Sequence, residues 1–323
     1  MELYPLKFQP VYSYRIWGGE KLKTKLNKNY EENSIGESWE ISDVNESETK
    51  VNEGDLKGLT LKQLIKKFKG DFVGNRVYDI FGEDFPLLIK FIDAKTPLSI
   101  QVHPSNALAK ERHNSFGKNE MWYVMEAEEG GELIVGFNQK VTKEIYSEHL
   151  NNSTLSDILN IEKVKKGDTF YIPTGRVHAI GAGVLLAEIQ QTSNITYRIY
   201  DYDRVDAKAG KKRELHTELA LDAIDFEFYD DYKTVYENKV NGSNKLVHSP
   251  YFKTNIIKVS GEIKKDYTNL DSFVIYMCVE GSVEVAYNNS VYNLNTGETL
   301  LIPACINHIK INADQAVLLE VYL

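Results

Sequence analysis

The sequence predicts a mainly β protein made of two related halves with a few helical segments. Short runs rich in Val, Ile, Tyr and Phe recur along the 323 residues, which include 20 Tyr and 13 Phe. Gly, Asn and Asp separate these runs, a pattern typical of β-sandwiches and β-barrels. One motif occurs twice, and a chain of this length usually folds as two domains. These observations exclude a regular alternation of strands and helices.

Five segments have the periodicity or the capping residues of helices. Leu61, Leu64, Ile65 and Phe68 share one helical face, and Gly70 follows them. Plausible N-cap residues or apolar spacing predict further helices over residues 105–114, 142–150, 153–161 and 213–226. We interpret these helices as inserts and a connector between strands.

A repeated motif links the two halves. Residues 167–178 and 297–308 both read Gly-acid-Thr-x-x-Ile-Pro-x4-His, and strand-like segments precede each copy. The Gly suits a tight turn into a strand, and the Pro suits its end or edge. The pair resembles the two-motif signature of cupins, small β-barrels whose lumen often holds a metal. This resemblance implies two cupin-like (jelly-roll) β-barrels, centred on residues 85–200 and 235–323. We expect a catalytic domain with helical inserts at 1–225 and a structural domain at 226–323.

Composition excludes several classes of protein. Lys and Arg total 38 against 47 Asp and Glu, a formal net charge of −9, so a non-specific nucleic-acid binder is not expected. No signal peptide is visible, and no apolar run reaches the ~20 residues of a membrane helix. The two cysteines, Cys278 and Cys305, form no disulfide framework and are expected to be buried. We expect a cytoplasmic protein that binds neither nucleic acid nor membrane.

Three residues far apart in the chain form a candidate metal site. Residues 98–103 alternate strictly, so Ser99, Gln101 and His103 share the polar face of a strand. Together with Glu120 and His178, His103 offers two imidazoles and a carboxylate, which form a catalytic zinc site when one position stays open. Gln101, on the same face, could add a carbonyl oxygen. The second copy of the motif retains His308 but follows an apolar strand, so we expect that half to be structural.

Three charged residues near this site each allow two interpretations. Lys90 lies in an otherwise apolar strand, where a lysine is costly without a counter-charge. It either pairs with a carboxylate or meets a substrate phosphate. Arg198 and Asp201 either form an ion-paired network at the rim, or Arg198 stabilises developing negative charge on a substrate.

The run Leu-Ser-Ile-Gln-Val-His-Pro at 98–104 resembles a highly specific motif of the type I mannose-6-phosphate isomerases, in their short bacterial form. Residues 9–19, 36–40, 86–90, 118–120 and 188–201 extend the resemblance. It implies an aldose–ketose isomerase that interconverts mannose 6-phosphate and fructose 6-phosphate through an enediol, with one zinc ion per chain. By family position, the metal ligands are His103, Glu120, His178 and Gln101, the catalytic residues are Arg198 and Lys118, and the substrate-binding residues are Ser99, Lys90, Trp17, Glu40 and Asp201.

Several alternatives stay open at this point. The general base is Lys118, Glu40, Asp201 or a zinc-bound water, and Asn194 stands where many relatives are expected to carry an acidic residue. A cupin dioxygenase would use iron on the same two-His, one-carboxylate set, and a non-catalytic sugar-binding cupin is a further alternative. The basic residues near the site favour a phosphorylated substrate. The oligomeric state is expected to be a monomer or a homodimer.

Overall fold

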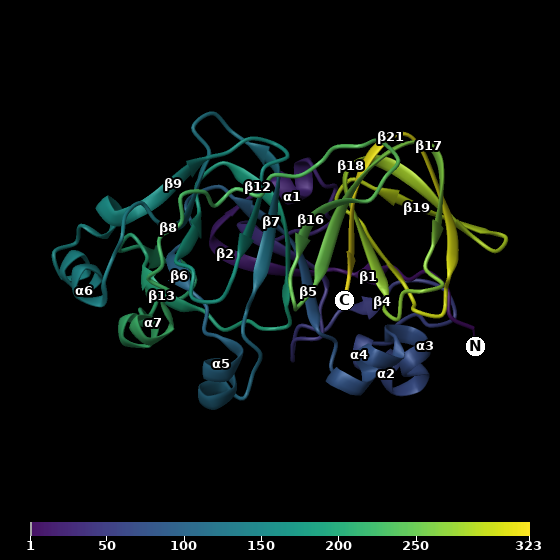
Figure 1. Cartoon of the computed structure of the whole chain (residues 1–323), viewed down its shortest axis with the longest axis horizontal. Helices are drawn as coiled ribbons and strands as arrows, with labels where there is room; N and C mark the ends of the chain where they lie inside the picture. The colour runs from purple at the N-terminus through teal and green to yellow at the C-terminus, as the bar shows by residue number, and fades with distance from the viewer. Residues whose placement is uncertain (1) are drawn as a thin grey trace.

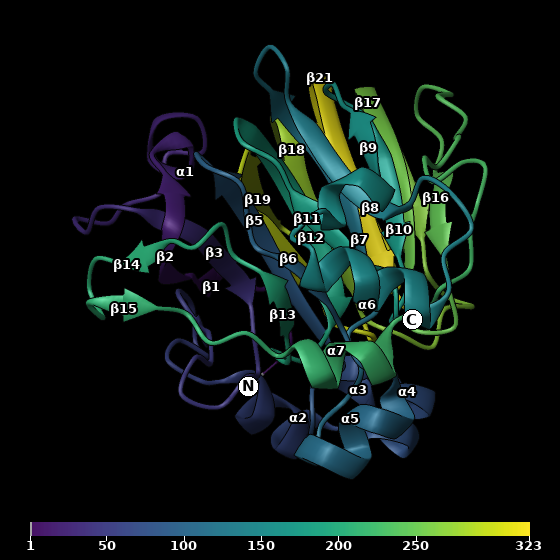
Figure 2. The same cartoon turned by 90° about the vertical axis from the view of Figure 1, so that its left-hand side faces the viewer.

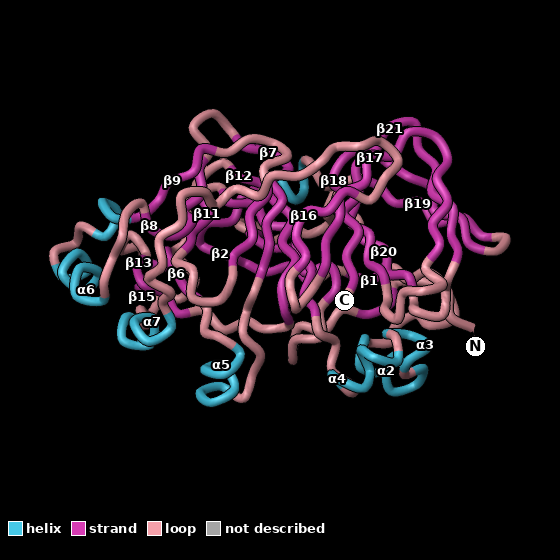
Figure 3. Tube along the Cα trace, in the orientation of Figure 1, coloured by secondary structure: helices cyan, strands magenta, loops and turns pink. Residues whose placement is uncertain are grey.

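Two β-rich halves lie side by side in the computed structural model, which describes residues 2–323 (Figure 1). Most helices lie at the periphery, along the lower side of the same view, so strands form the frame of both halves (Figure 3). The predicted mainly β architecture is confirmed. Within the described residues, none of the helices combines the length and the apolar character needed to cross a membrane.

The first half is built from two antiparallel sheets. One sheet has the order β10 (Thr169–Ile172), β7 (Glu120–Ala127), β12 (Val184–Gln191), β5 (Leu87–Ala94), β2 (Val11–Gly19) and β3 (Ile35–Ile41). The other has the order β13 (Tyr197–Tyr200), β6 (Ile100–Val102), β11 (His178–Ile180), β8 (Glu132–Phe137) and β9 (Leu159–Lys163). Trp122 and Leu186 of the first sheet share a buried cluster with Val135 and Ile180 of the second. The two sheets therefore pack face to face around one core.

The second half is built mainly from three long strands. β17 (Lys253–Asp266), β21 (His308–Tyr322) and β18 (Val274–Tyr287) form its centre, with β16 (Asn244–His248), β19 (Ser290–Asn295) and β20 (Thr299–Ile302) beside them. Register shifts interrupt the ladders, and bulges of this kind bend strands. At one of them Gly281 has φ +75°, and a Cβ there would lie 2.4 Å from the Gln315 carbonyl oxygen, so only glycine fits.

A second buried cluster joins the two halves. Leu185, Ala187 and Ile189, on one face of β12, belong to the same cluster as Ile275 and Leu319 of the second half. Strands β5 and β12 are therefore buried on both faces, which explains their nearly continuous apolar sequences. The sheet of the first half that contains β7, β12 and β5, and with them one wall of the candidate site, is also its interface with the second half.

The remaining elements lie outside these sheets. The helices are α1 (Lys21–Thr24), α2 (Leu61–Phe68), α3 (Gly70–Val73), α4 (Asn75–Phe81), α5 (Asn106–His113), α6 (Lys143–Asn151), η1 (Leu155–Ile158) and α7 (Thr217–Ala223). The short strands β1 (Phe8–Gln9) and β4 (Lys50–Val51) pair with each other. The strands β14 (Val205–Asp206) and β15 (Lys211–Lys212) form a hairpin that projects to the left in Figure 2.

Three of the predicted helices are confirmed, and two need correction. Helices α2, α5 and α6 match the segments at 61–68, 105–114 and 142–150. The helix predicted over 153–161 is wrong, because only one short turn forms before β9, where Ile161 pairs with Ile134 of β8. The helix predicted over 213–226 shortens to α7. Cys278 is buried as expected, whereas Cys305 is exposed.

Candidate active site

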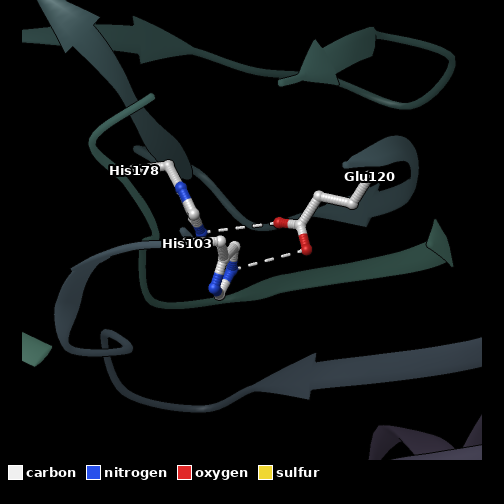
Figure 4. Close-up of side chains that lie close together, drawn as sticks. All are labelled: His103, Glu120 and His178. Carbon is white, nitrogen blue, oxygen red and sulfur yellow. Dashed lines mark ion pairs between the residues drawn. The ribbon is translucent and has the colours of Figure 1, made fainter. Parts of the chain in front are cut away.

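His103, Glu120 and His178 converge inside the first half, as the sequence predicts (Figure 4). One potential ligand atom from each lies within 4.8 Å of the others, and all three side chains are buried. Glu120 places Oε1 3.4 Å from Nε2 of His178 and Oε2 3.6 Å from Nε2 of His103. This set can hold a metal ion.

The register of the strands explains the convergence. Gln101 of β6 pairs directly with His178 of β11, and His103 follows Gln101 on the same face. Glu120 begins β7 in the facing sheet. The side chains of both sheets point into the space between them, so three residues spread over 76 positions of the chain share one site.

Backbone carbonyls orient both imidazoles. His103 Nδ1 donates to the Ile195 oxygen at 2.9 Å, and His178 Nδ1 donates to the Arg176 oxygen at 2.8 Å. A carbonyl only accepts, so each Nδ1 carries the proton and each Nε2 presents a lone pair to Glu120. Burial lowers the pKa of both histidines, that of His178 to about 3, which keeps the imidazoles in their neutral, metal-binding form.

Glu120 shows that the site suits a cation. Its Oε1 is buried and accepts no hydrogen bond from the residues that the structure describes. Burial, followed by the charge of Glu188, raises the pKa of the Glu120 carboxyl, so a negative charge at this position calls for a positive partner. A divalent cation held by Glu120 and the two Nε2 atoms would meet both needs. The residues therefore fit a metal ion.

Two buried lysines flank this trio. Lys118 donates to Glu120 Oε2 and lies 3.2 Å from His103 Nε2. Burial alone would lower the pKa of Lys118, but the carboxylates of Glu120 and Glu188 outweigh it and raise that pKa. Lys90 donates to Glu188 Oε1 at 3.1 Å, so the carboxylate partner considered for Lys90 is present.

Glu188 is the central residue that the sequence interpretation did not single out. It lies on β12 between the two lysines, and Trp122 Nε1 donates to its Oε2 at 2.9 Å. Burial alone would raise the pKa of Glu188, but Lys118 and Lys90 lower it. A carboxylate inside the fully buried run Val184–Gln191 was the available signal, because such a group needs charged partners.

A cavity of about 390 Å³ opens beside the trio. Arg15, Glu37, Asn194 and Arg213 line it, although the sequence interpretation assigned none of them to the substrate. Gln101 Nε2 lies 3.2 Å from His178 Nε2, at the boundary between cavity and trio. The cavity is also lined by these predicted site residues: Trp17, Lys90, Ser99, Gln101, Lys118 and Arg198.

Two predicted substrate residues have other partners. Glu40 is buried, pairs with Lys28 at 2.6 Å, and lines a different cavity. Asp201 accepts from Arg204 and Arg213 in a rim network, the first of the two interpretations considered for it. Neither lines the cavity beside the trio. Their roles toward a substrate stay predictions.

Comparisons with known proteins agree with this geometry. The family model "Phosphomannose isomerase type I, catalytic domain" matches residues 5–161, and "Mannose-6-phosphate isomerase, cupin domain" matches residues 231–323. Mannose-6-phosphate isomerase ManA of Bacillus subtilis is 33% identical over 96% of this chain and 96% of its own length. The Streptococcus mutans mannose-6-phosphate isomerase is 34% identical, with the same coverage of both chains.

Solved structures of similar proteins have the same fold. The mannose 6-phosphate isomerase of Bacillus subtilis superposes with a TM-score of 0.90 at 31% identity, covering 99% of this chain and 100% of that one. A variant of the Salmonella typhimurium phosphomannose isomerase superposes with a TM-score of 0.78 at 16% identity, covering 98% of this chain and 99% of that one. The second likeness supports the fold alone.

Proposed function

We propose, because this chain belongs to the type I phosphomannose isomerase family, that it interconverts mannose 6-phosphate and fructose 6-phosphate through an enediol. The observation that carries the proposal is the buried His103, Glu120 and His178 trio beside a cavity with basic side chains. The reaction moves a proton between two adjacent carbons of the sugar. The enzyme must therefore bind the sugar oxygens, hold the phosphate and manage one proton.

Zinc, one ion per chain, is the proposed metal. His103, Glu120 and His178 would hold it, and Gln101 would join them if its amide turned to present Oε1 where Nε2 now lies. A bound zinc ion would act as a Lewis acid toward the sugar oxygens, which increases the acidity of the carbon beside the carbonyl. Every other part of the chemistry falls to side chains of the chain itself.

The cavity supplies charge for an anionic substrate. Cationic side chains outnumber carboxylates in its lining. The cationic residues are Arg15, Lys90, Lys118, Arg198 and Arg213, and the acidic ones are Glu37, Glu188 and Asp206. We assign Lys90 and Ser99, with the aromatic wall of Trp17, to the binding of the sugar phosphate. Holding the phosphate away from the reacting carbons would fix their position relative to the trio.

Lys118 and Arg198 are the proposed catalytic residues. Lys118 touches Glu120 and His103, so its amino group lies where the reacting carbons would meet the trio. As an ammonium it can donate a proton to the enediol, and it can take a proton from a carbon only after it has given up its own. Arg198 would stabilise the negative charge that develops on the enediol oxygens. Glu40 and Asp201 are already held by other groups outside the cavity, which favours Lys118 or a metal-bound water as the base.

The two alternatives to an isomerase are less well supported. A cupin dioxygenase or a non-catalytic sugar-binding cupin would not account for relatives that are mannose-6-phosphate isomerases over nearly their full length. The cytoplasmic location and the monomeric or dimeric state stay predictions from the sequence. So does the division of the chain into domains at 1–225 and 226–323.

Exchange of one metal ligand tests the proposal. His103→Ala should lose bound metal and lower isomerase activity more than about a hundredfold while the fold is retained, because only Glu120 and His178 of the trio remain, with the weaker amide oxygen of Gln101. Metal content, circular dichroism and a coupled assay for fructose 6-phosphate measure this, with chelation as a second route. His308→Ala is the matched control, since His308 holds the same place in the second motif but is exposed. A fully active His103→Ala enzyme would refute the metal assignment.

A further inference from the structure

The second half repeats the active-site wall strand for strand. The order β10-β7-β12-β5 of the first half recurs as β20-β18-β21-β17, on the right of Figure 1. Phe170 and Leu300, the fourth residues of the two motifs, pair with Trp122 and Tyr276 respectively. These pairs fix the equivalence of the two walls, residue by residue.

The equivalence places a second carboxylate at the position of Glu188. Glu188 pairs across the ladder with Trp122, and Glu320 pairs with Tyr276 in the same way. The Tyr276 hydroxyl donates to Glu320 Oε1 at 3.3 Å, as the indole of Trp122 donates to Glu188. The neighbouring strand contributes Lys90 in the first half, and Asn255 takes its place beside Glu320 in the second.

The metal-binding part of the site is not repeated. The register that equates Trp122 with Tyr276 also equates Glu120 with Val274, which cannot bind a cation. His308, the counterpart of His178, lies at the surface, and its Nε2 is 3.6 Å from Asp266 Oδ1. The second half therefore repeats the polar wall without the metal-binding side chains.

Hydrogen-bonding groups converge on Glu320. Its two oxygens lie within hydrogen-bond distance of donor groups from five residues. The Tyr267 and Tyr276 hydroxyls also contact each other, so these donors fill the roughly four lone-pair sites of the carboxylate without an excess. The Lys265 ammonium carries three donors, and Glu320 and Ser243 take two of them at 2.6 and 2.7 Å. The third N–H of the Lys265 ammonium is thus available to an oxygen of a ligand. The donors to Glu320 are Ser243, Asn255, Lys265, Tyr267 and Tyr276.

A cavity opens on this cluster. Its volume is about 430 Å³, close to the 390 Å³ of the first cavity. Its lining contains one cationic residue, Lys265, and two acidic ones, Asp266 and Glu320, so it has no surplus of positive charge for a phosphate. Tyr267 and Tyr322 add aromatic walls suited to the apolar faces of a sugar ring.

We propose that this cavity is a second, metal-free binding site for an uncharged sugar, formed by Glu320, Asn255, Lys265 and Ser243. A sugar hydroxyl oxygen would accept a hydrogen bond from the third N–H of Lys265, and the ring would lie against Tyr322. The site performs no isomerisation, because it lacks both the metal ligands and a counterpart of the Lys118 and Glu120 pair.

Calorimetry on the full chain tests the proposal while the first cavity is filled. Saturating sorbitol 6-phosphate, a polyol phosphate that has no carbonyl and cannot be isomerised, is added to occupy the catalytic cavity, and D-mannose is then titrated. We expect one further mannose to bind per chain. Lys265→Met and Ser243→Ala should each weaken that binding about tenfold or more. Lys310→Met, an exposed change on the same half, should not.

Measuring isomerase turnover of the same variants tests the second site independently of the proposed catalytic function. All three variants should keep the turnover of the parent enzyme, because none of these residues lines the catalytic cavity. Absence of mannose binding over the millimolar range overturns the second site, and so does binding that neither variant weakens. If Lys265→Met fails to fold, Ser243→Ala, which removes one hydroxyl, decides the outcome.

Discussion

Arg198 approaches the catalytic cavity from β13 with part of its guanidinium uncommitted. Its Nη1 donates to the Glu214 oxygen at 2.7 Å, whereas its buried Nε has no hydrogen-bond partner among the described residues. A buried donor without a partner is costly unless a ligand satisfies it. This geometry fits a residue that meets negative charge on the substrate.

Removal of this guanidinium should separate turnover from metal binding. Arg198→Ala is expected to retain the metal and to lower kcat about a hundredfold or more, because charge stabilisation in the transition state is lost. Metal analysis and steady-state kinetics measure the two effects. Arg112→Ala is the control, since Arg112 pairs with Asp222 at the surface. Joint loss of metal and activity would give Arg198 a structural role instead.

Glu37 makes part of the stability sensitive to acid. Although burial alone would raise its pKa, Arg15 and Lys90 lower the pKa of Glu37 to about 2. A depressed carboxyl pKa gives stability that is fully present above the ordinary value near 4.5 and is lost as the pH falls toward 2. The contribution is roughly 3 kcal/mol at most.

Glu37→Gln should therefore destabilise the protein in a pH-dependent manner. At pH about 6 the variant should be less stable than the parent by up to roughly 3 kcal/mol, and the difference should shrink toward pH about 3. Urea unfolding at both pH values gives the comparison. Glu129→Gln, in an exposed turn, serves as the control. A difference that does not change with pH would contradict the assigned cause.

Among the elements, α2 shows how a local signal determines a helix boundary. Thr60 accepts from Gln63 N, and the Gln63 side chain accepts from Thr60 N, which forms a complete capping box. Leu61, Leu64 and Ile65 are buried on the inner face. Both the cap and the spacing are visible in the sequence, and the helix predicted from the spacing is confirmed, although the Thr60 cap was not predicted.

Loss of this cap should affect stability and leave catalysis intact. Thr60→Ala is expected to lower the free energy of unfolding by about 1 kcal/mol, because one helix donor loses its acceptor. Urea denaturation measures the loss, and the coupled assay should show unchanged kcat. Thr60→Ser, which retains the hydroxyl, should restore most of the stability. An equal loss in both variants would contradict the capping explanation.

Sequence predicts this fold well where the signal is local and poorly where it depends on distant partners. The motif at 98–104, the segment at 118–120 and the repeated motif ending at His178, together with the family resemblance, were sufficient to predict the trio His103, Glu120 and His178. Residues 159–161, the start of β9, were assigned to a helix because their strand character comes only from pairing with β8. Glu188 was missed for the same reason, since its role depends on lysines 98 and 70 positions away. The positions of Glu40 and Asp201 likewise depend on partners that no local pattern reveals.

At the scale of the whole molecule, the shared cluster between the halves should make unfolding cooperative. Leu319, fully buried in the second half, packs in the same cluster as the outer face of β12. Leu319→Ala should lower the free energy of unfolding by about 2–5 kcal/mol. Loss of isomerase activity and loss of circular dichroism should coincide along one urea transition. Val291→Ala, at an exposed position, is the control. Two separate transitions would show that the halves unfold independently.

Strand β12 carries a constraint on insertions and deletions. Glu188 faces the catalytic cavity, while its neighbours Ala187 and Ile189 face the other half of the molecule. Addition or loss of one residue near the start of β12 would invert this alternation. The Glu188 carboxylate would then enter the apolar interface between the two halves, and apolar side chains such as Ile189 would face the cavity. We therefore expect insertions and deletions, in natural relatives and in laboratory libraries, to be tolerated in the hairpin at 205–212 and not in this strand. Altered substrate preference would then evolve by reshaping the rim while the wall keeps its length.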